Sequence, residues 1–219
     1  MARSPRTTPE QLSKARLRSW VEGKILDLGA PQIHAQHGAR KAEVLGAMTG
    51  TVVEIGPGTG PNMRYYAPGV KVIAIEPNPN MHDALRASAA QHDVDLEIRT
   101  VQGERIDVDD DTADGVVGTL VLCGVDDPEA VVAEIRRVLK PGGTYFFLEH
   151  VAAEPGSGIR RVQDLVHRPH RWMANGCETN RDTAAVIDAA GFSAVDHETI
   201  DVGRNAAYTR IQLVGTATE

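Results

Sequence analysis

The segment Thr51-Val-Val-Glu-Ile-Gly-Pro-Gly-Thr-Gly60 decides the fold of this chain. Its first five residues form a short, mostly apolar run typical of a buried strand, and three glycines follow at every second position. Glycine after a buried strand lets the backbone approach a ligand closely, and the helix that follows offers unpaired N–H groups. The segment therefore predicts a nucleotide-type site at the end of a strand.

The spacing of these glycines distinguishes between ligands. Gly56, Gly58 and Gly60 are followed by Pro61 and Asn62, so the third-step glycine of a dinucleotide fingerprint is missing. The Gly-Lys-Ser/Thr ending of an ATP-binding loop is missing as well. Both NAD and ATP are therefore disfavoured, and an NAD-dependent reductase is kept only as a distant alternative.

Two carboxylates flank the glycine segment. Glu54 lies two positions before Gly56, where a negative charge repels a pyrophosphate but favours the ammonium group of an amino-acid ligand. Glu76 ends the next apolar run, where a carboxylate accepts hydrogen bonds from both ribose hydroxyls. A ligand with a ribose and a cationic aminoacyl tail satisfies both acids, and S-adenosylmethionine fits that description better than NAD. The alternative is that the segment is an ordinary glycine turn and that the two acids have no part in binding a ligand.

Strands and helices alternate through most of the chain. Strands are expected at residues 51–55, 71–75, 95–101, 114–122 and 144–148, with helices over 62–66, 79–91 and 129–139. This alternation predicts βαβ units and a mostly parallel sheet with helices on both faces. Two further alternating segments, 193–202 and 207–215, predict an antiparallel pair at the edge of a seven-stranded sheet.

The region before the first strand has a helical pattern. Residues 1–9 are polar and predict a disordered tail, and the apolar spacing in residues 9–48 is helical. Gly38 and Gly50 punctuate this region, so we expect two or three helices.

The pattern weakens after the fifth strand. Residues 152–176 are rich in Gly, Arg, His and Pro, and predict a lid insertion with a broken helix. A helix over 179–190 follows, with Thr179 as its N-cap and Gly191 just after its end.

The bulk composition bounds the class of protein. The 219 residues suit one domain, and 42% hydrophobic with 24% charged residues indicate a globular chain. A net charge of -7 argues against a nucleic-acid partner, and no apolar run reaches the roughly 20 residues that span a bilayer. Two cysteines in a chain of this size suit a reducing compartment, so we expect a cytoplasmic protein. The oligomeric state stays open.

At this point the chain resembles the class I S-adenosylmethionine-dependent methyltransferases. The resemblance extends from Val52 to Val151 and implies a Rossmann-like fold. The motifs that carry it are Val53-Glu-Ile-Gly-Pro-Gly-Thr-Gly60, Glu76-Pro-Asn-Pro-Asn-Met81, Gly103-Glu104, Thr119-Leu-Val-Leu-Cys123 and Arg136-Arg-Val-Leu-Lys-Pro-Gly-Gly143. One structural domain is expected, in which residues 1–50 supply the tail and lid helices and residues 51–219 bind the cofactor.

The resemblance also implies which residues contact S-adenosylmethionine and its product S-adenosylhomocysteine. In such enzymes the glycine segment holds the methionine and ribose parts, and the acid at Glu76 binds the ribose hydroxyls. Met81 packs on the adenine, and residues after the fourth strand lie beside the reactive methyl group. The implied cofactor-binding residues are Glu54, Gly56, Pro57, Gly58, Thr59, Gly60, Glu76, Pro77, Asn78, Met81, Gly103, Glu104, Thr119, Leu120 and Val121.

Three motifs are similar to those of the alkyl-thiol S-methyltransferase-like group, which includes vertebrate membrane-associated enzymes and bacterial enzymes that methylate small thiols. The motifs are Thr119-Leu-Val-Leu-Cys123, Phe146-Phe-Leu-Glu-His-Val151 and Asn175-Gly-Cys-Glu-Thr-Asn-Arg181. The vertebrate members have an apolar N-terminal anchor, whereas residues 1–10 are polar here, so membrane association is not expected.

The acceptor is harder to predict from the residues. A thiol has a pKa of about 8.5 and supplies some thiolate without a strong base, whereas an amine or a phenol more often requires a proton acceptor. His150 ends the fifth strand, where parallel sheets place ligand-facing groups, and Asp164 and His167 lie in the insertion. His167 is the preferred general base or orienting group, because histidine titrates near neutrality. The alternative for His150 is a structural histidine that caps the strand end, and the alternative for Asp164 and His167 is a solvated helix face.

A metal ion is not expected. His167, His170 and Cys177 form a permissible ligand set, but a fourth ligand is not apparent and methyl transfer requires no metal. Cys123 ends an apolar strand and is expected to pack in the core.

The leading hypothesis is therefore methylation of a small thiol, from a natural product or a toxic compound, by S-adenosylmethionine. One alternative is C-, O- or N-methylation of another small molecule, such as a quinone precursor. A second alternative is a protein that binds S-adenosylmethionine without turning it over.

Overall fold

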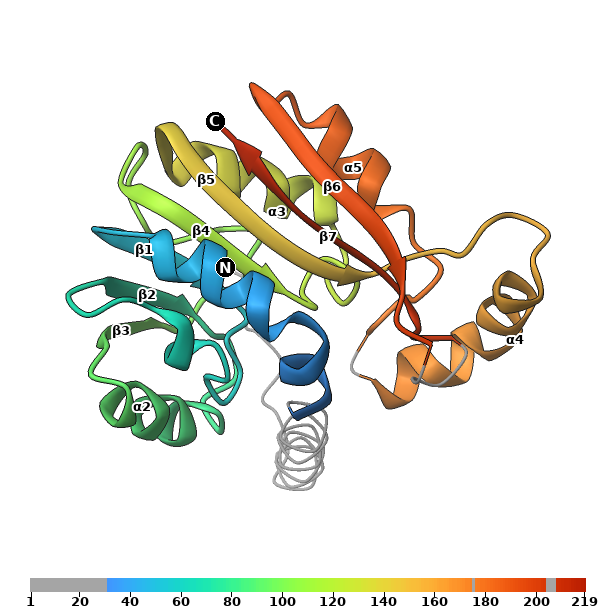
Figure 1. The fold of residues 1–219 in the computed structure, drawn as a ribbon, viewed down its shortest axis with the longest axis horizontal. Helices are drawn as coiled ribbons and strands as arrows, with labels where there is room; N and C mark the ends of the chain where they lie inside the picture. The colour runs from blue at the N-terminus through green and yellow to red at the C-terminus, as the bar shows by residue number, and fades with distance from the viewer. Residues whose placement is uncertain (1–30, 175, 204–207) are drawn as a thin grey trace, which may run out of the picture.

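A single mixed sheet lies at the centre of the fold. The structure is a computed structural model and describes residues 31–174, 176–203 and 208–219. In these ranges seven strands follow the order β3-β2-β1-β4-β5-β7-β6, with helices on both faces (Figure 1). All neighbouring pairs up to β5 are parallel, whereas β7 runs antiparallel to β5 and β6. The predicted Rossmann-like α/β fold with an antiparallel last strand is confirmed.

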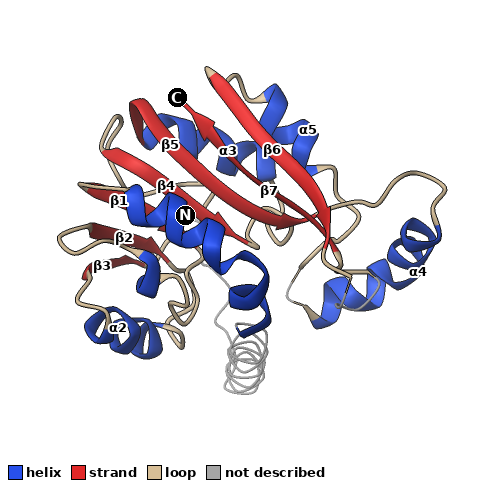
Figure 2. Cartoon of the chain, in the orientation of Figure 1, coloured by secondary structure: helices blue, strands red, loops and turns tan. Residues whose placement is uncertain are grey.

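Figure 2 shows how strands and helices alternate along the chain. The strands are β1 (Thr51–Ile55), β2 (Lys71–Ile75), β3 (Asp95–Arg99), β4 (Ala113–Thr119), β5 (Leu139–His150), β6 (Ala194–Asp201) and β7 (Ile211–Thr218). The helices are η1 (Met63–Tyr65), α2 (His82–Gln91), α3 (Pro128–Val138), α4 (Gly158–Met173) and α5 (Thr183–Ala189), together with a helix over residues 31–47. None of the described helices is long and apolar enough to cross a membrane.

Each face of the sheet has its own apolar core, because successive side chains of a strand point to opposite faces. In β5, Tyr145 and Phe147 belong to the core that α3 and α5 cover. Phe146 and Leu148 belong to the other core, which includes residues of the 31–47 helix, η1 and α2. Burial on both faces explains why these strands are almost continuously apolar in sequence.

The strand order places the glycine segment and the residues after β4 at the same edge. The chain builds β2 and β3 on one side of β1, and β4 and β5 on the other. In open parallel sheets ligands bind beyond the carboxyl ends of the strands where this direction reverses. Here the reversal lies between β1 and β4, which end at Ile55 and Thr119.

Two predictions about helix breaks are wrong. Gly38 lies inside the 31–47 helix, and a Cβ atom there would lie 3.1 Å from the Tyr65 hydroxyl oxygen. Glycine at this position permits close helix packing rather than ending the helix. The predicted broken helix in the insertion is instead α4, which continues through Pro169. The expected tail at residues 1–9 lies outside the described residues.

The start of α5 also differs from the prediction. Thr179 is not its N-cap: the helix begins at Thr183, and the Asp182 side chain accepts a hydrogen bond from the Ala185 N–H at 3.2 Å. Gly191 follows the helix with a φ of 86°, as predicted for the residue after a helix end. The last two strands pair antiparallel as expected. Of these two only β6 lies at an edge of the sheet, since β7 lies between β5 and β6.

Gly215 allows the last three strands to pack closely. It pairs with Phe147 of β5 on one side and His197 of β6 on the other. The rings of Phe147 and His197 meet edge to face, with centroids 6.4 Å apart. A Cβ atom at position 215 would lie 2.3 Å from the Asp196 carbonyl oxygen and 2.5 Å from the His197 Cβ atom.

We predict that Gly215→Ala lowers the free energy of unfolding by about 3 kcal/mol, because backbone must move to admit the methyl group. The matched control is Gly158→Ala at the start of α4, where an added Cβ meets no atom within 4 Å. The control should change stability by less than about 0.5 kcal/mol. Urea denaturation followed by circular dichroism measures both, and equal stability of the two variants would contradict the packing described.

Candidate active site

The three glycines after β1 adopt a conformation that disfavours other residues. Gly56, Gly58 and Gly60 have φ values of 59°, 57° and 83°. A Cβ atom on Gly56 would lie 3.1 Å from Val121 Cγ2, and one on Gly60 would lie 2.9 Å from Leu85 Cδ1. Side chains here would strain the backbone and crowd both neighbours. The glycine segment thus forms the narrow backbone cradle that the sequence predicts.

Glu76, directly after β2, ties the glycine segment to the next loop. Its carboxylate accepts hydrogen bonds from the N–H groups of Gly58, at 3.0 Å, and Asn78, at 2.8 Å. His82 Nε2 lies 3.0 Å from the main-chain oxygen of Glu76. The residue is buried at the carboxyl end of a parallel strand, which is the position that suits a ribose-binding acid.

Glu54 points from β1 into the face covered by the 31–47 helix. Its two oxygens accept hydrogen bonds from Asn62 Nδ2, at 2.8 Å, and the Tyr66 hydroxyl, at 2.7 Å. Burial raises the pKa of Glu54 and lowers the pKa of Lys41, which donates to Asn62 Oδ1, to about 8. Both carboxylate oxygens of Glu54 thus have partners within the protein, and a direct contact between Glu54 and a cofactor ammonium group stays a prediction.

The end of β4 is connected to the same network. Asn62 Nδ2 also donates to Thr119 Oγ1 at 3.2 Å. The next residue, Leu120, has a φ of 58°, a left-handed conformation that costs a non-glycine residue about 1–3 kcal/mol. The Leu120 N–H donates to the Leu148 carbonyl oxygen of β5 at 2.7 Å, which fixes the turn. Strain of this kind concentrates at functional sites.

Glu149 of β5 holds the segment that follows this turn. Its fully buried carboxylate accepts hydrogen bonds from three successive N–H groups, those of Val121 at 3.0 Å, Leu122 at 2.9 Å and Cys123 at 3.0 Å. Burial raises the pKa of Glu149, and these hydrogen bonds favour its charged form. The sequence analysis missed this residue, although an acid within the apolar run Phe146-Phe-Leu-Glu-His-Val151 was the available signal.

Arg181 binds the opposite side of the same segment. Its guanidinium donates to the carbonyl oxygens of Leu122, at 2.5 Å, and Val125, at 2.8 Å. It also donates to the Glu178 carboxylate at 3.0 Å, and the Glu178 N–H donates to the Cys123 carbonyl oxygen at 2.6 Å. The segment after β4 is therefore held from β5 and from the chain between α4 and α5.

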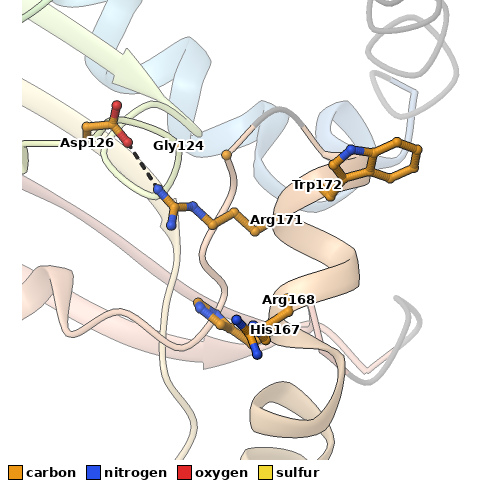
Figure 3. A pocket seen from close by; sticks show the side chains of 7 residues that line it. Gly124, Asp126, His167, Arg168, Arg171 and Trp172 are labelled. Carbon is orange, nitrogen blue, oxygen red and sulfur yellow. Dashed lines mark hydrogen bonds and ion pairs between the residues drawn. The ribbon is translucent and has the colours of Figure 1, made fainter.

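A cleft of about 520 Å³ opens between α4 and the segment after β4. It is lined by Gly124, Asp126, His167, Arg168, Arg171, Trp172 and Gly176. Figure 3 shows Arg171 reaching from α4 to Asp126, with 3.1 Å between the paired atoms, and His167 and Arg168 further along the helix. Arg171 also lies 3.3 Å from the Glu178 carboxylate, whereas Arg168 and His167 contribute the other basic side chains of the lining.

The structure separates the three residues predicted to be catalytic. His167 lines the cleft, as its prediction requires. His150 ends β5, and its Nδ1 atom lies 3.5 Å from Cys177 Sγ. Asp164 is exposed and accepts hydrogen bonds from Arg160 and Asn180, both at 3.0 Å, so it joins α4 to the following loop and is not part of the cleft lining.

The other predicted cofactor contacts lie in loops at the same edge of the sheet. Met81 is buried at the start of α2, and Pro77 and Asn78 directly follow the Glu76 carboxylate. Gly103 packs against the end of β1, since a Cβ atom there would lie 3.2 Å from Ile55 Cγ2. Glu104 follows Gly103 in this loop.

Solved structures with a similar fold include methyltransferases. An S-adenosylmethionine-dependent methyltransferase from Aquifex aeolicus has a TM-score of 0.63 at 16% identity, over 90% of this chain and 97% of that chain. Phospholethanolamine N-methyltransferase 2 of Haemonchus contortus, solved with phosphomonomethylethanolamine and S-adenosylhomocysteine, has a TM-score of 0.63 at 14% identity, over 84% and 52%. These likenesses show the fold.

Sequence comparison identifies the family. Residues 53–147 match the model of a methyltransferase domain. Thiol S-methyltransferase TMT1B of Rattus norvegicus is 40% identical over 157 residues, 68% of this chain but only 62% of the rat protein. Thiol S-methyltransferase TMT1A of Homo sapiens is 34% identical over 176 residues, 76% of this chain and 70% of the human protein. The chain therefore belongs to the class I S-adenosylmethionine-dependent methyltransferases, with thiol S-methyltransferases among its relatives.

Proposed function

We propose that this chain transfers the methyl group of S-adenosylmethionine to the sulfur of a small thiol. The observation that carries the proposal is the likeness to thiol S-methyltransferases at 34–40% identity. With TMT1A it covers 176 residues, a longer stretch than the domain match at residues 53–147. The likeness therefore extends beyond the domain that many methyltransferases share.

The loops at the carboxyl edge would hold the cofactor. The backbone at Gly56, Gly58 and Gly60 would hold the methionine and ribose parts, because a chain without side chains lets a ligand approach its N–H groups closely. Glu76 would accept hydrogen bonds from the ribose hydroxyls, and Met81 would pack on the adenine. Bound there, S-adenosylmethionine would supply an electrophilic methyl group, and the segment after Thr119 would form the wall beside it.

The cleft beside α4 suits an acceptor that reacts as an anion. Arg168, Arg171 and His167 line it together with a single acid, Asp126. Positive charge lowers the pKa of a nearby thiol and raises the thiolate fraction at neutral pH, whereas it repels an ammonium ion. His167 would orient the acceptor or take its proton. Since methyl transfer is an in-line displacement, most of the protein's contribution lies in positioning.

Cofactor binding is tested by Glu76→Gln. The substitution removes the charge and places an amide N–H₂ against the N–H of Gly58 or Asn78, so we expect the dissociation constant for S-adenosylhomocysteine to rise about 10–100-fold. The free energy of unfolding should fall by less than about 2 kcal/mol. Titration calorimetry and urea denaturation measure the two effects.

The matched control is Glu97→Gln on β3, whose carboxylate pairs with Lys71 at 2.7 Å on the open surface. It should bind S-adenosylhomocysteine as the unaltered protein does. Unchanged affinity of Glu76→Gln would contradict the ribose contact. Saturable binding of NAD, without binding of S-adenosylmethionine, would overturn the cofactor assignment altogether.

The acceptor is tested with one carbon skeleton and three nucleophiles. We expect 2-phenylethanethiol to be methylated at least about tenfold faster than 2-phenylethanol or 2-phenylethylamine, because only the thiol forms an anion near neutral pH. Methyl transfer is followed with radiolabelled cofactor. Phenol, which is more acidic than 2-phenylethanol, is tested separately as a second oxygen acceptor. Turnover of phenol or amine without turnover of the thiol would show an O- or N-methyltransferase. Binding without turnover of any acceptor would indicate a non-catalytic protein.

A further inference from the structure

Two cysteines and a histidine from separate parts of the chain meet beside the cleft. Cys123 follows β4, His150 ends β5, and Cys177 lies between α4 and α5. Their ligand atoms all lie within 4.8 Å of one another. We propose that these three residues bind Zn²⁺ and that the sulfur of the acceptor thiol takes the fourth coordination position. The role of the acceptor rests on the proposed function, whereas the metal site does not.

Two of the three distances within this cluster match the spacing of zinc ligands, and the third, between Cys123 and His150, is within 4.8 Å. With Zn–S of about 2.3 Å and Zn–N of about 2.05 Å, tetrahedral angles separate two sulfurs by about 3.8 Å and a sulfur from a nitrogen by about 3.6 Å. Cys177 Sγ lies 3.6 Å from Cys123 Sγ and 3.5 Å from His150 Nδ1. The two sulfurs are also too far apart for a disulfide, whose bond is about 2.05 Å long.

The donor set selects the class of metal. Two thiolates and one imidazole favour Zn²⁺ over the hard cations Mg²⁺ and Ca²⁺, which take oxygen ligands. Three protein ligands with one exchangeable position are the arrangement of catalytic zinc sites, including Cys₂His sites.

The surrounding chain holds Cys123 in place without a metal. Its N–H donates to Glu149 at 3.0 Å, and its carbonyl oxygen accepts from the Glu178 N–H at 2.6 Å. The Cys177 N–H donates to the Ala174 carbonyl oxygen at 3.0 Å. Outer contacts of this kind fix the direction of metal ligands and sharpen affinity.

The cluster adjoins the proposed acceptor cleft. Gly124 and Gly176 line the cleft, and each is the direct neighbour of one of the two cysteines. His170 of α4 also contacts the Cys177 thiol and is the internal competitor for the fourth position. We assign that position to the acceptor, because His170 is not among the ligand atoms that lie within 4.8 Å of one another.

The chemistry of the step balances with the reactants already named. The acceptor thiol binds Zn²⁺ as a thiolate and releases its proton to solvent. Its sulfur then attacks the methyl carbon, and the new S–C bond forms as the old bond to the sulfonium breaks. The bonding electron pair stays on the departing sulfur, which becomes the neutral thioether of S-adenosylhomocysteine. The methylated product is a neutral thioether and a weaker zinc ligand than the thiolate.

The metal site is tested on the reduced, metal-free full-length protein without any acceptor. We expect one Zn²⁺ per chain by competition with a chromophoric chelator, and Co²⁺ should give the visible absorption of a tetrahedral thiolate site. Cys123→Ser, Cys177→Ser and His150→Gln should each weaken zinc binding by more than about 100-fold, since even outer-shell changes cost about 10–100-fold. Circular dichroism checks that each variant is folded, and the half-exposed Cys177 gives a result even where a change at buried Cys123 unfolds the chain.

Two further variants make the assignment specific. His92→Gln, after α2, is the control and should bind zinc as the unaltered protein does. His170→Gln should also retain zinc within about threefold of the original affinity if the fourth position is open. Loss of zinc in His170→Gln would overturn the open position. Absence of zinc binding by the reduced protein, or equal binding by Cys177→Ser, would overturn the site.

The role of the acceptor is tested separately with the Co²⁺-loaded protein. Addition of 2-mercaptoethanol should shift the visible absorption, and zinc-loaded protein should methylate this thiol at least about tenfold faster than metal-free protein. Equal rates with and without zinc would overturn thiol activation by the metal and leave the proposed function intact. Zinc binding with no methylation of any thiol would instead overturn the proposed function and leave the metal site intact.

Discussion

A buried carboxylate near the carboxyl end of β5 fixes the backbone on which the site is built. Removing Glu149 from water costs several kcal/mol, and the structure compensates by aligning three successive N–H groups on its two oxygens. Residues 121–123 consequently cannot shift independently of β5. This restraint holds Val121 against Gly56 and places the Cys123 thiol beside His150, so both the predicted cofactor wall and the thiol cluster depend on one side chain.

A second buried acid performs the corresponding task on the other face of the sheet. Glu54 connects β1 to Asn62 and Tyr66, and Asn62 in turn connects Lys41 of the 31–47 helix to Thr119 at the end of β4. A fully buried carboxylate therefore holds each side of the topological reversal: Glu54 holds β1, and Glu149 holds the segment after β4. This arrangement explains how a glycine-rich segment keeps a defined shape despite its conformational freedom.

Local patterns predicted the fold well because burial on two faces imposes a continuous apolar run on each strand. The apolar runs predicted the strands and placed Glu76 at a strand end, and the glycine spacing predicted the cradle. The failures have a common physical origin in contacts between distant residues. Gly38 lies inside a helix, where its missing side chain lets Tyr65 pack closely. Glu149 looks like an ordinary strand residue, because its hydrogen-bond partners are backbone N–H groups of the segment after β4, which is distant in sequence. Local spacing offered only His167, His170 and Cys177 as a permissible ligand set, and no metal was expected from it, whereas the fold brings Cys177 together with Cys123 and His150.

If the chain methylates a thiol as proposed, the cluster bears on the presence of two cysteines beside the cleft. An unligated thiol next to an incoming thiol is open to oxidation and to mixed disulfides, and of the two cysteines Cys177 is the partly exposed one. Coordination of both sulfurs to one cation removes this hazard, since their lone pairs are then engaged with the metal. The same cation would hold the acceptor as a thiolate without a strong protein base, which agrees with the position of Asp164 outside the cleft. With the proposed zinc bound, the acceptor specificity would originate in the ligand preference of the metal, because an alcohol or an amine is a poorer partner for a thiophilic cation than a thiolate.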